Sequence, residues 1–571
     1  MKELFFEITG FEPYPFQLEI AEKIFTDEKN LVITASTGSG KTWLSCFPFV
    51  YAKLNNINFA DRMFYVLPQR TLVTAVANTL KPRLKDYGIN VTVQMGSQPD
   101  DPFFEGDIIV TTIDQLLSTY IGLPYSSSRN LSNIAPGSLV GSYIVLDEFH
   151  LLEVEKSLAT FIDLSKRINP FSKILMMTAT APTSFVKEVS KKISGDFNLI
   201  SPNQIVSLQK EEKSVRKRIV RWSDLPITSE MIVDQHKDRT LVVVNTVNRA
   251  QVLFKELQYL LRKKNLNIDV ICLHARFLPQ DRQEKEAVIK EVFKKDSDQE
   301  MIVVANQVVE VGLDISSSVL ISELCPANAL IQRIGRCTRY GEEEGEVFVH
   351  GIDQIYLPYK KEIMERTKKY LIEHQVMEIT AVEEAKIVEE VHLDDDKITL
   401  EQIPFTRTRK EVNISLLLGE TQYLKELIRD IRNIQVIIHP NPSELDLEKK
   451  PERFSIPVST IQSGLKQIID KFSLSENVFY PEFPDEWEKG QQPSWKPLQK
   501  IEDVLKHTLI ALSPKIASYS REIGFVMNES GNYISKETAS KGFSRKAFSY
   551  QKESYFEPGL QPKLAQKFYK P

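Results

Sequence analysis

Short apolar runs alternate with segments of helical length up to about residue 200. Leu31–Thr34 has the pattern of a buried strand, and Trp43–Leu54 follows it with the length and apolar character of a helix. Further runs of strand length are Met63–Leu67, Asn90–Gln94, Asp107–Thr111, Tyr143–Leu146 and Lys173–Met177. Because strands alternate with helices, this pattern predicts an α/β domain with a mainly parallel sheet.

A second alternating region begins near residue 206. The basic run Lys213–Arg218 is interpreted as a linker or an edge strand, and strand patterns then resume at Thr240–Val244, Asp269–Leu273 and Met301–Val304. Past residue 355 the pattern changes, and two segments are typical of amphipathic helices, Lys360–Gln375 and Gln422–Ile434. We therefore expect two α/β domains, residues 1–205 and 206–355, followed by a largely helical linker and accessory region, residues 356–571.

Charge and cysteine content exclude several classes of protein. The 571 residues carry 72 Lys and Arg against 77 Asp and Glu, so any nucleic-acid binding must be confined to a channel. Four cysteines without CxxC spacing favour neither a disulfide framework nor a zinc site, which fits a reducing cytosol. The N-terminus lacks a secretory pattern, and no run of about 18 apolar residues occurs. We expect a cytoplasmic protein with no membrane segment.

The segment Ala35–Thr42, with the sequence ASTGSGKT, joins the first strand to its helix. This is the context of a phosphate-binding loop, whose backbone N–H groups curl around phosphates. Lys41 would place a charge on the terminal phosphates of ATP, and Thr42 would offer a hydroxyl to Mg²⁺. Lys41 and Thr42 make a simple glycine-rich turn a poorer interpretation. The nucleotide-binding candidates are Ser36, Thr37, Gly38, Ser39, Gly40, Lys41 and Thr42.

An acidic pair, Asp147 and Glu148, ends the strand pattern that begins at Tyr143. Ligands of open α/β sheets bind at the carboxyl ends of strands. Asp147 would hold Mg²⁺ together with Thr42, while Glu148 would orient and deprotonate an attacking water. An acidic pair found alone is often only solvated, but the phosphate-binding loop upstream favours the catalytic interpretation.

The segment QRIGRCTR, residues 332–339, is expected on a helix of the second domain. Arg336 and Arg339 would reach across a cleft as arginine fingers, so that hydrolysis requires domain closure, and Gln332 is a third catalytic candidate. The alternative is a solvated basic face of a helix. Gly312 and Asp314, just upstream, are added to the nucleotide-binding candidates.

In this order ASTGSGKT, DEFH at Asp147–His150, TATA at Thr178–Ala181 and QRIGRCTR resemble the motifs of superfamily 2 DExH helicases. The resemblance covers about residues 10–345 and implies two tandem RecA-like domains. It also implies that Gln17 recognises adenine and that Thr178 and Thr180 couple ATP to nucleic acid. His150 would couple the acidic pair to the helix that carries the arginines. The alternatives are purely structural roles, an ordinary polar residue at a helix start for Gln17 and a histidine of the core for His150.

A nucleic-acid track is expected across both domains, with contacts to phosphates. By motif position the candidates are Arg70, Thr71, Thr111, Thr112, Thr246 and Gln307. Each threonine has an alternative as an ordinary helix cap or turn residue.

Two longer stretches, Leu273–Arg282 and Ala305–Ile315, resemble signatures of the CRISPR-associated type I helicase, a motor usually paired with an HD nuclease. Ala275 and Gly312 depart from this pattern, because serine is common at both positions. An HD site needs a His-Asp dipeptide, and none of the eight histidines is followed by Asp. We expect a stand-alone helicase, with any nuclease on another polypeptide.

The leading hypothesis is an ATP- and Mg²⁺-dependent translocase on single-stranded DNA, recruited by a Cascade-type CRISPR surveillance complex. The resemblance implies movement from 3′ to 5′. A DNA-repair or RNA-remodelling helicase is the alternative with the same motor. A third hypothesis, a scaffold that only binds nucleotide, is disfavoured by the complete set of Lys41, Glu148, Arg336 and Arg339.

Overall fold

The chain forms two compact units, each built from two separate stretches of sequence: Met1–Pro226 with Val309–Asp430, and Ile227–Val308 with Ile431–Pro571. The computed structural model describes residues 1–26, 30–35, 39–96, 98–125, 131–132, 134–193, 197–200, 217–294, 297, 299–310, 312–339, 344–352, 356–380, 383–392, 403, 405–420, 422–429, 433–449, 451–483 and 492–527.

The first unit contains an eight-stranded sheet with the order β4-β3-β5-β2-β6-β7-β1-β8. Its strands are β1 (Asn30–Thr34), β2 (Met63–Leu67), β3 (Val91–Met95), β4 (Gln98–Pro99), β5 (Ile108–Thr112), β6 (Tyr143–Asp147), β7 (Lys173–Thr178) and β8 (Phe197–Ile200). All neighbours pair in parallel except β3 and β4. The mainly parallel α/β sheet predicted from the apolar runs is therefore confirmed.

Both faces of this sheet are covered by helices, because successive strand residues point to opposite faces. On β1, Leu31 and Ile33 join one buried cluster, whereas Val32 joins the other. The first cluster is closed by α1 (Lys2–Thr9), α2 (Pro15–Thr26), α3 (Lys41–Leu54) and α4 (Arg70–Leu84). The second is closed by α5 (Ile113–Tyr120), α6 (Ala159–Ile168) and α7 (Thr183–Lys192). Because both faces of the sheet are covered, the strands have uninterrupted apolar sequences.

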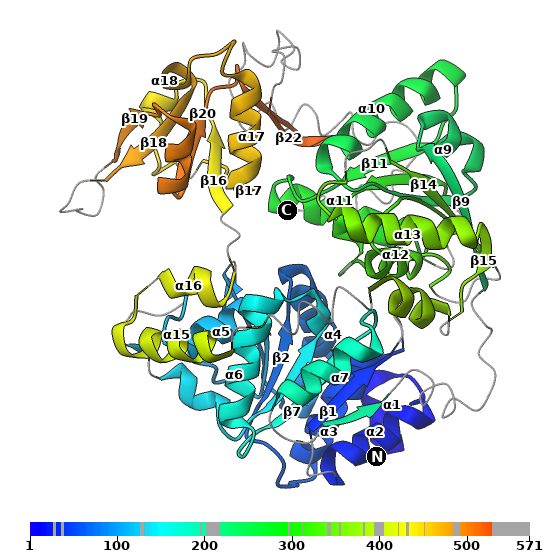
Figure 1. Ribbon diagram of the computed structural model, residues 1–571, viewed down its shortest axis with the longest axis vertical. Helices are drawn as coiled ribbons and strands as arrows, with labels where there is room; N and C mark the ends of the chain where they lie inside the picture. Colours follow the sequence, from blue (N-terminus) through cyan, green and yellow to red (C-terminus); the bar gives the residue numbers. More distant parts are fainter. Residues whose placement is uncertain are drawn as a thin grey trace. The chain divides into compact units, whose positions relative to one another are not determined.

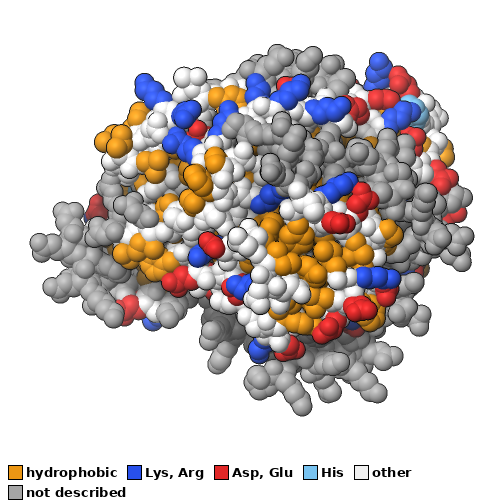
Figure 2. All heavy atoms as spheres, turned by 90° about the horizontal axis from the view of Figure 1, so that it is seen from below, with side chains coloured by type: hydrophobic (Ala, Val, Ile, Leu, Met, Phe, Trp, Pro, Cys, Tyr) orange, Lys and Arg blue, Asp and Glu red, His pale blue; other side chains and the backbone are white. Residues whose placement is uncertain are grey.

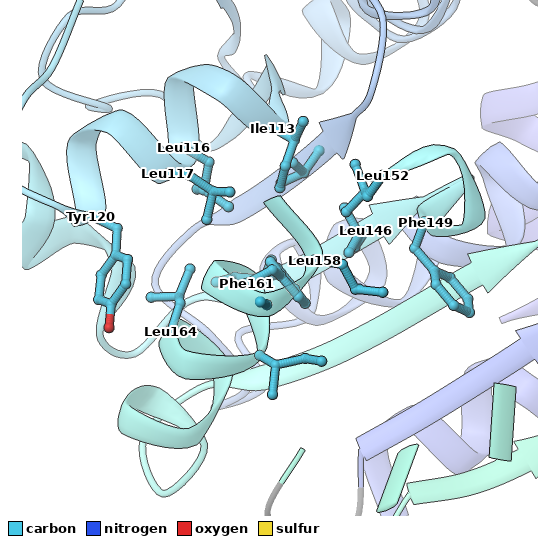
Figure 3. Close-up of a cluster of buried hydrophobic side chains, with 14 of the residues drawn as sticks. Ile113, Leu116, Leu117, Tyr120, Leu146, Phe149, Leu152, Leu158, Phe161 and Leu164 are labelled. Carbon is cyan, nitrogen blue, oxygen red and sulfur yellow. The ribbon is translucent and has the colours of Figure 1, made fainter. Parts of the chain in front are cut away.

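The cluster beneath α5 and α6 is drawn in Figure 3. Leu116 and Leu117 of α5 project toward Phe161 of α6, with Leu158 beside it, and all four side chains are fully buried. Phe149, just after β6, belongs to the same cluster. The segment that carries the acidic pair is therefore anchored from behind by apolar packing.

Two helices from late in the sequence, α15 (Phe405–Leu418) and α16 (Gln422–Leu427), lie against α5 and α6 (Figure 1). Thr160 Oγ1 donates a hydrogen bond to the Leu427 carbonyl at 2.7 Å. Ser415 Oγ donates to the Ile121 carbonyl at 2.9 Å. Residues distant in sequence thus complete one face of the first domain.

A second sheet has the strand order β11-β12-β10-β13-β14-β9-β15. Its strands are β9 (Lys217–Pro226), β10 (Arg239–Val243), β11 (Asp269–Leu273), β12 (Met301–Ala305), β13 (Val319–Glu323), β14 (Glu344–Gly351) and β15 (Val376–Glu378). β12 pairs in parallel with β10 and β11, and β14 pairs in parallel with β13 and β9, whereas β15 pairs with β9 in the antiparallel direction. Its helices are α9 (Ser229–Gln235), α10 (Val247–Lys264), α11 (Pro279–Val292), α12 (Ala327–Ile334) and α13 (Lys361–Glu373). The predicted basic segment Lys213–Arg218 overlaps the start of β9, but the edge-strand interpretation is wrong, because β9 pairs with both β14 and β15. Residues 213–216 lie outside the described part.

The accessory region is helical at first and then becomes a sheet. The predicted helix Gln422–Ile434 is wrong beyond Leu427, because α16 ends at that residue and β16 (Asn433–Ile438) begins at Asn433. This strand joins β17 (Phe454–Pro457), β18 (Val478–Glu482), β19 (Ser494–Pro497) and β20 (Leu509–Leu512) in the order β17-β16-β20-β18-β19. The helices α17 (Val458–Ile468) and α18 (Leu474–Asn477) accompany it. A largely helical region was expected, and the β-branched run of β16 explains this difference.

A hairpin of β21 (Ala517–Ser520) and β22 (Gly524–Met527) joins this module to the rest of the second unit. Gln251 Nε2 of α10 donates to the Ile523 carbonyl at 2.7 Å. Tyr519 Oη donates to Asp281 Oδ2 at 2.5 Å. Among the residues that the structure describes, no helix is both long enough and apolar enough to span a membrane.

We predict that Phe161→Ala lowers the free energy of unfolding of the first unit by about 3–5 kcal/mol, because it leaves a cavity in a fully buried cluster. Hydrophobic side chains also reach the surface, as the orange patches in Figure 2 show. Phe171 is 65% exposed and serves as the control. Denaturant unfolding should therefore leave Phe171→Ala within about 0.5 kcal/mol of the parent. Equal losses in both variants would contradict the packing described.

Candidate active site

The sheet order places three candidate segments at one edge. β6, β7 and β1 are adjacent and parallel, and their carboxyl ends lead to Asp147, Thr178 and Ala35 respectively. The Ala35 N–H donates to the Thr178 carbonyl at 3.0 Å. The acidic pair, the TATA segment and the start of the phosphate-binding loop therefore meet where open α/β sheets bind ligands.

The described end of the phosphate-binding loop is shaped around Gln17. Gly40 has a φ of 78°, a left-handed conformation that favours glycine, and a Cβ added there would lie 2.5 Å from Gln17 Nε2. Gln17 Nε2 donates to the Gly40 carbonyl at 3.3 Å, and its Oε1 accepts from the Tyr14 N–H at 2.9 Å. Three candidates of this loop, Ser36, Thr37 and Gly38, lie outside the described residues.

Lys41 and Glu148 form an ion pair that is largely buried. Lys41 Nζ lies 3.1 Å from Glu148 Oε1. Burial opposes ionisation of Glu148, but the charge of Lys41 outweighs it and holds the pKa of the Glu148 carboxyl below the ordinary value. Burial and the charge of Glu148 raise the pKa of Asp147 to about 6. The two neighbouring carboxyls thus differ in pKa because their environments differ.

Glu148 has a backbone conformation that supports this assignment. Its φ is 52°, which is left-handed and uncommon for a residue other than glycine. The Ala179 N–H donates to Glu148 Oε2 at 3.4 Å, and Phe149 beside it is buried. The turn after β6 is held in a strained form that aims the Glu148 carboxyl across the sheet edge toward Lys41.

Tyr65 of β2 is a site residue that sequence reasoning missed. Its Oη donates to Asp147 Oδ2 at 2.8 Å, and its side chain also hydrogen-bonds Thr42. Both candidate Mg²⁺ ligands are therefore positioned by one fully buried phenol. Within the apolar run Met63–Leu67 this tyrosine has the pattern of a core residue. The only signal in the sequence was a tyrosine in a strand-like run, and it gains meaning only once β2 is known to pair with β6, which ends at Asp147.

A cavity of about 830 Å³ opens at this edge, within the first unit. Aromatic residues of the N-terminal segment, including Phe11 and Tyr14, form part of its wall. Of the candidate residues, the following line it: Gln17, Gly40, Lys41, Thr42, Asp147, Glu148, Gly312, Asp314, Gln332, Arg336 and Arg339. Residues separated by three hundred positions in sequence are thus brought to one cavity.

His150 lies at the centre of a hydrogen-bonded cluster. Its Nδ1 lies 2.8 Å from Thr178 Oγ1, and its Nε2 lies 2.8 Å from Thr180 Oγ1. Gln332 Nε2 approaches the same His150 Nε2 at 3.3 Å and Thr180 Oγ1 at 3.5 Å. Burial lowers the pKa of His150 to about 4, so the imidazole is neutral at neutral pH. The DExH motif, the TATA segment and α12 share one polar network.

The arginines of QRIGRCTR lie where the helix ends. α12 ends at Ile334, so Arg336 and Arg339 follow it instead of lying on it as expected. Arg336 donates to the carbonyls of Val309 at 2.9 Å and Glu310 at 2.6 Å, while Arg339 pairs with Asp314 at 2.7 Å. Both arginines line the cavity and have protein partners. They would have to exchange these partners for phosphates.

The third arginine of this segment has a different environment. Arg333 is fully buried, and its Nε donates to Glu310 Oε1 at 2.8 Å. Its Nη1 donates to Ser322 Oγ at 2.9 Å. A buried arginine paired in this way fixes α12 against β13 and is unsuited to act as a finger.

The nucleic-acid candidates differ in what their side chains can reach. Arg70 is exposed at the start of α4, and Thr71 lies beside Gly312, where an added Cβ would be 3.1 Å away. Thr111 is fully buried and donates to the Gln94 carbonyl at 2.8 Å, so its hydroxyl has a structural role. Thr112 caps α5 by accepting from the Gln115 N–H.

The remaining two candidates, Thr246 and Gln307, belong to the second unit. Thr246 caps α10 by accepting from the Arg249 N–H at 3.2 Å. Gln307 is partly buried and follows β12. The cap alternative raised for the threonines thus describes Thr112 and Thr246, whereas Arg70, Thr71 and Gln307 stay candidates for phosphate contacts.

The residues present fit Mg²⁺ bound together with a nucleotide. Thr42 and Asp147 supply hard oxygen ligands, and Mg²⁺ typically takes its other ligands from water and phosphates. Among the described residues no group of three or more His, Cys, Asp or Glu side chains could hold a metal by itself. Ser39 Oγ is buried and has no hydrogen-bond partner within the described part, as expected for a group that awaits a ligand.

Comparisons with known proteins agree with this geometry. A DEAD/DEAH box helicase family model matches residues 14–189, and a model of the C-terminal region of the CRISPR-associated nuclease/helicase Cas3 matches residues 236–342. A CRISPR-associated helicase Cas3 of Thermoproteus tenax is 27% identical over 377 residues, which cover 62% of this chain and 61% of that protein. By these matches the chain resembles superfamily 2 DExH helicases, and Cas3 among them.

Solved structures show the same fold for this helicase. T. fusca Cas3 with AMPPNP has a TM-score of 0.61 at 17% identity, with 92% of this chain and 70% of that chain covered. A chain of a CRISPR RNA-guided surveillance complex in a pre-nicking state has a TM-score of 0.57 at 17% identity, covering 91% and 68%. The helicase thus has the two tandem RecA-like domains expected from its motifs. It spans 43–62% of the length of four curated Cas3 relatives.

We predict that Tyr65→Phe in this helicase weakens Mg²⁺-dependent ATP binding by about tenfold, because Asp147 and Thr42 lose the phenol that positions them. Affinity for a fluorescent ATP analogue, titrated with Mg²⁺ and again with EDTA, measures the effect. Tyr143→Phe on the adjacent β6 is the matched control, since the buried Tyr143 Oη has no hydrogen-bond partner among described residues. Equal affinities for both variants would contradict the role of Tyr65.

Proposed function

We propose that this chain is an ATP- and Mg²⁺-dependent translocase on single-stranded DNA. One observation carries the proposal: a single cavity is lined by Lys41, Asp147 and Glu148 from one RecA-like domain and by Arg336 and Arg339 from the segment after α12. A phosphoryl-transfer site needs positioned charge on both sides of the phosphates. Hydrolysis in such a site is completed by the second domain, which makes it suited to drive movement.

The chemistry of the step follows from the residues present. Glu148, whose pKa is lowered in the structure by its pairing with Lys41, would accept a proton from a water directed at the terminal phosphate. Lys41 would leave its ion pair with Glu148 and bind the phosphates instead. Mg²⁺, held by Thr42 and Asp147, would supply charge neutralisation at the phosphate oxygens. Arg336 and Arg339 would stabilise charge that develops in the transition state.

We assign ATP binding to residues 1–205, the arginine fingers to residues 206–355 and accessory contacts to residues 356–571. Gln17 would recognise adenine, consistent with its place on the cavity wall. The polar network of His150, Thr178, Thr180 and Gln332 would couple the nucleotide to the DNA track. These assignments rest on motif position and on the contacts described above.

The biological setting we propose is type I CRISPR interference, in the cytoplasm. Support comes from the Cas3 relative of Thermoproteus tenax and from the fold shared with a chain of a CRISPR RNA-guided surveillance complex. By this likeness the partner is a Cascade-type complex and the polarity is 3′ to 5′. No histidine of the sequence is followed by Asp, so we propose that cutting belongs to a separate HD nuclease subunit.

We predict that Lys41→Ala lowers the DNA-stimulated rate of ATP hydrolysis by roughly a hundredfold or more, since a charge aimed at the transferred phosphate is lost. Lys53→Ala lies on the same helix, outside the cavity lining, and should retain the parent rate. Steady-state hydrolysis with and without single-stranded DNA measures both variants. A Lys41→Ala chain with full turnover would refute the mechanism.

The same assay separates the proposed function from its alternative. Single-stranded DNA should stimulate hydrolysis more than RNA of the same sequence, and a partial duplex with a 3′ overhang should be unwound before one with a 5′ overhang. Stronger stimulation by RNA would favour an RNA-remodelling helicase instead. Unwinding only from a 5′ overhang would contradict the polarity.

A further inference from the structure

The helix formed by residues 383–392, here named the bridging helix, has no counterpart among the expected motifs. It starts with a cap, since the N–H of Glu383 donates to Thr380 Oγ1 at 3.3 Å. Its buried side chains recur at helical spacing and are Glu384, Ile387, Val388, Val391 and His392. One face of this helix is therefore packed into the first unit.

A buried ion pair fixes the start of the bridging helix. Arg218 Nη1 of β9 donates to Glu384 Oε1 at 3.0 Å, with both side chains less than 10% exposed. Arg218 Nε also donates to the Cys337 carbonyl at 2.9 Å. Cys337 lies between Arg336 and the following turn. The same arginine thus ties the bridging helix to the segment that carries the arginine fingers.

The middle of the bridging helix contacts the nucleotide-binding domain. Glu389 Oε2 accepts from the Thr183 N–H at 2.6 Å. Thr183 is the first residue of α7, which directly follows the TATA segment, and its preceding residue Pro182 supplies no side-chain cap. A carboxylate at an uncapped helix start is stabilising, because it satisfies a free N–H and faces the positive end of the helix dipole.

At its end the bridging helix also accepts a hydrogen bond from a backbone N–H at a helix start, here that of α12. His392 Nε2 accepts from the Asn328 N–H at 3.3 Å, and Pro326 at the helix start supplies no side-chain cap. Burial, with smaller contributions from Arg366 and His150, lowers the pKa of His392 to about 4, which keeps the acceptor nitrogen unprotonated. α12 is the helix that carries Gln332 into the polar network around His150.

We propose that the bridging helix is a coupling element, which passes displacements between the TATA segment and the arginine-finger segment. Glu389 and His392 are its positioning residues, because each caps a helix start in a different RecA-like domain and both lie on one rigid turn of helix. The proposal rests on the proposed motor function and specifies a second route between its two halves, beside the His150 network.

Amide hydrogen exchange tests this coupling without any activity. Glu389→Met removes the acceptor at α7, whereas Glu389→Gln keeps one. The Met variant should raise exchange by about fivefold or more at the remote site, in peptides that cover α12, and the Gln variant should stay near the parent. In the reciprocal pair, His392→Phe should raise exchange at α7 and His392→Gln should not. A rise confined to the helix next to each substitution would overturn the proposal.

ATP hydrolysis provides the second readout. Each of Glu389→Met and His392→Phe should lower the DNA-stimulated kcat by about fivefold or more with little change in the KM for ATP, and the double variant should be no slower than the slower single variant. If the double variant loses kcat by the product of the two single losses, or if kcat is unchanged in the single variants, the two residues act as independent local caps and the coupling is overturned. A parent chain without DNA-stimulated hydrolysis would contradict the proposed function instead, while the exchange result still decides the coupling.

Discussion

The burial of opposite charges at one edge of a parallel sheet is the constraint on which the rest of this structure depends. Lys41, Asp147 and Glu148 are each costly to bury alone, and they are tolerated because Lys41 lies 3.1 Å from Glu148 while Tyr65 donates to Asp147. These contacts require β2, β6, β7 and β1 to follow one another in the sheet. The fold therefore holds together a charge arrangement that a nucleotide with its metal ion would rearrange.

This charged edge is continuous with polar contacts that extend toward the second half of the site. His150 joins Glu148 to Thr178 and Thr180, and Gln332 reaches the same imidazole from α12. The bridging helix provides a parallel connection. The polar groups of these networks are buried and hydrogen-bonded to one another. A change in the phosphates bound at the site would therefore alter hydrogen bonds within the networks. Such a site can relate the state of the nucleotide to the arrangement of domains.

The strands and the motif residues were predictable, whereas the residues that orient them were not. Met63–Leu67 was placed correctly because all five side chains are buried, which leaves a continuous apolar run. Tyr65 within it could not be distinguished from a core residue. The helix predicted over Gln422–Ile434 ran into the first two residues of β16, because a short apolar run fits either period until its partner strands are known. Glu389 acts on an N–H two hundred residues away, which no local pattern reveals.

The central claim is that residues after α12 complete a hydrolytic site begun by the phosphate-binding loop. The most direct measurement is single-turnover ATP hydrolysis by Arg339→Ala with DNA bound, alongside its affinity for the nucleotide. Arg339 pairs with the exposed Asp314 in the structure, so its removal leaves no buried charge unpaired. The account predicts an unchanged affinity and a rate lowered by about a hundredfold or more. A rate equal to that of the parent chain would contradict it.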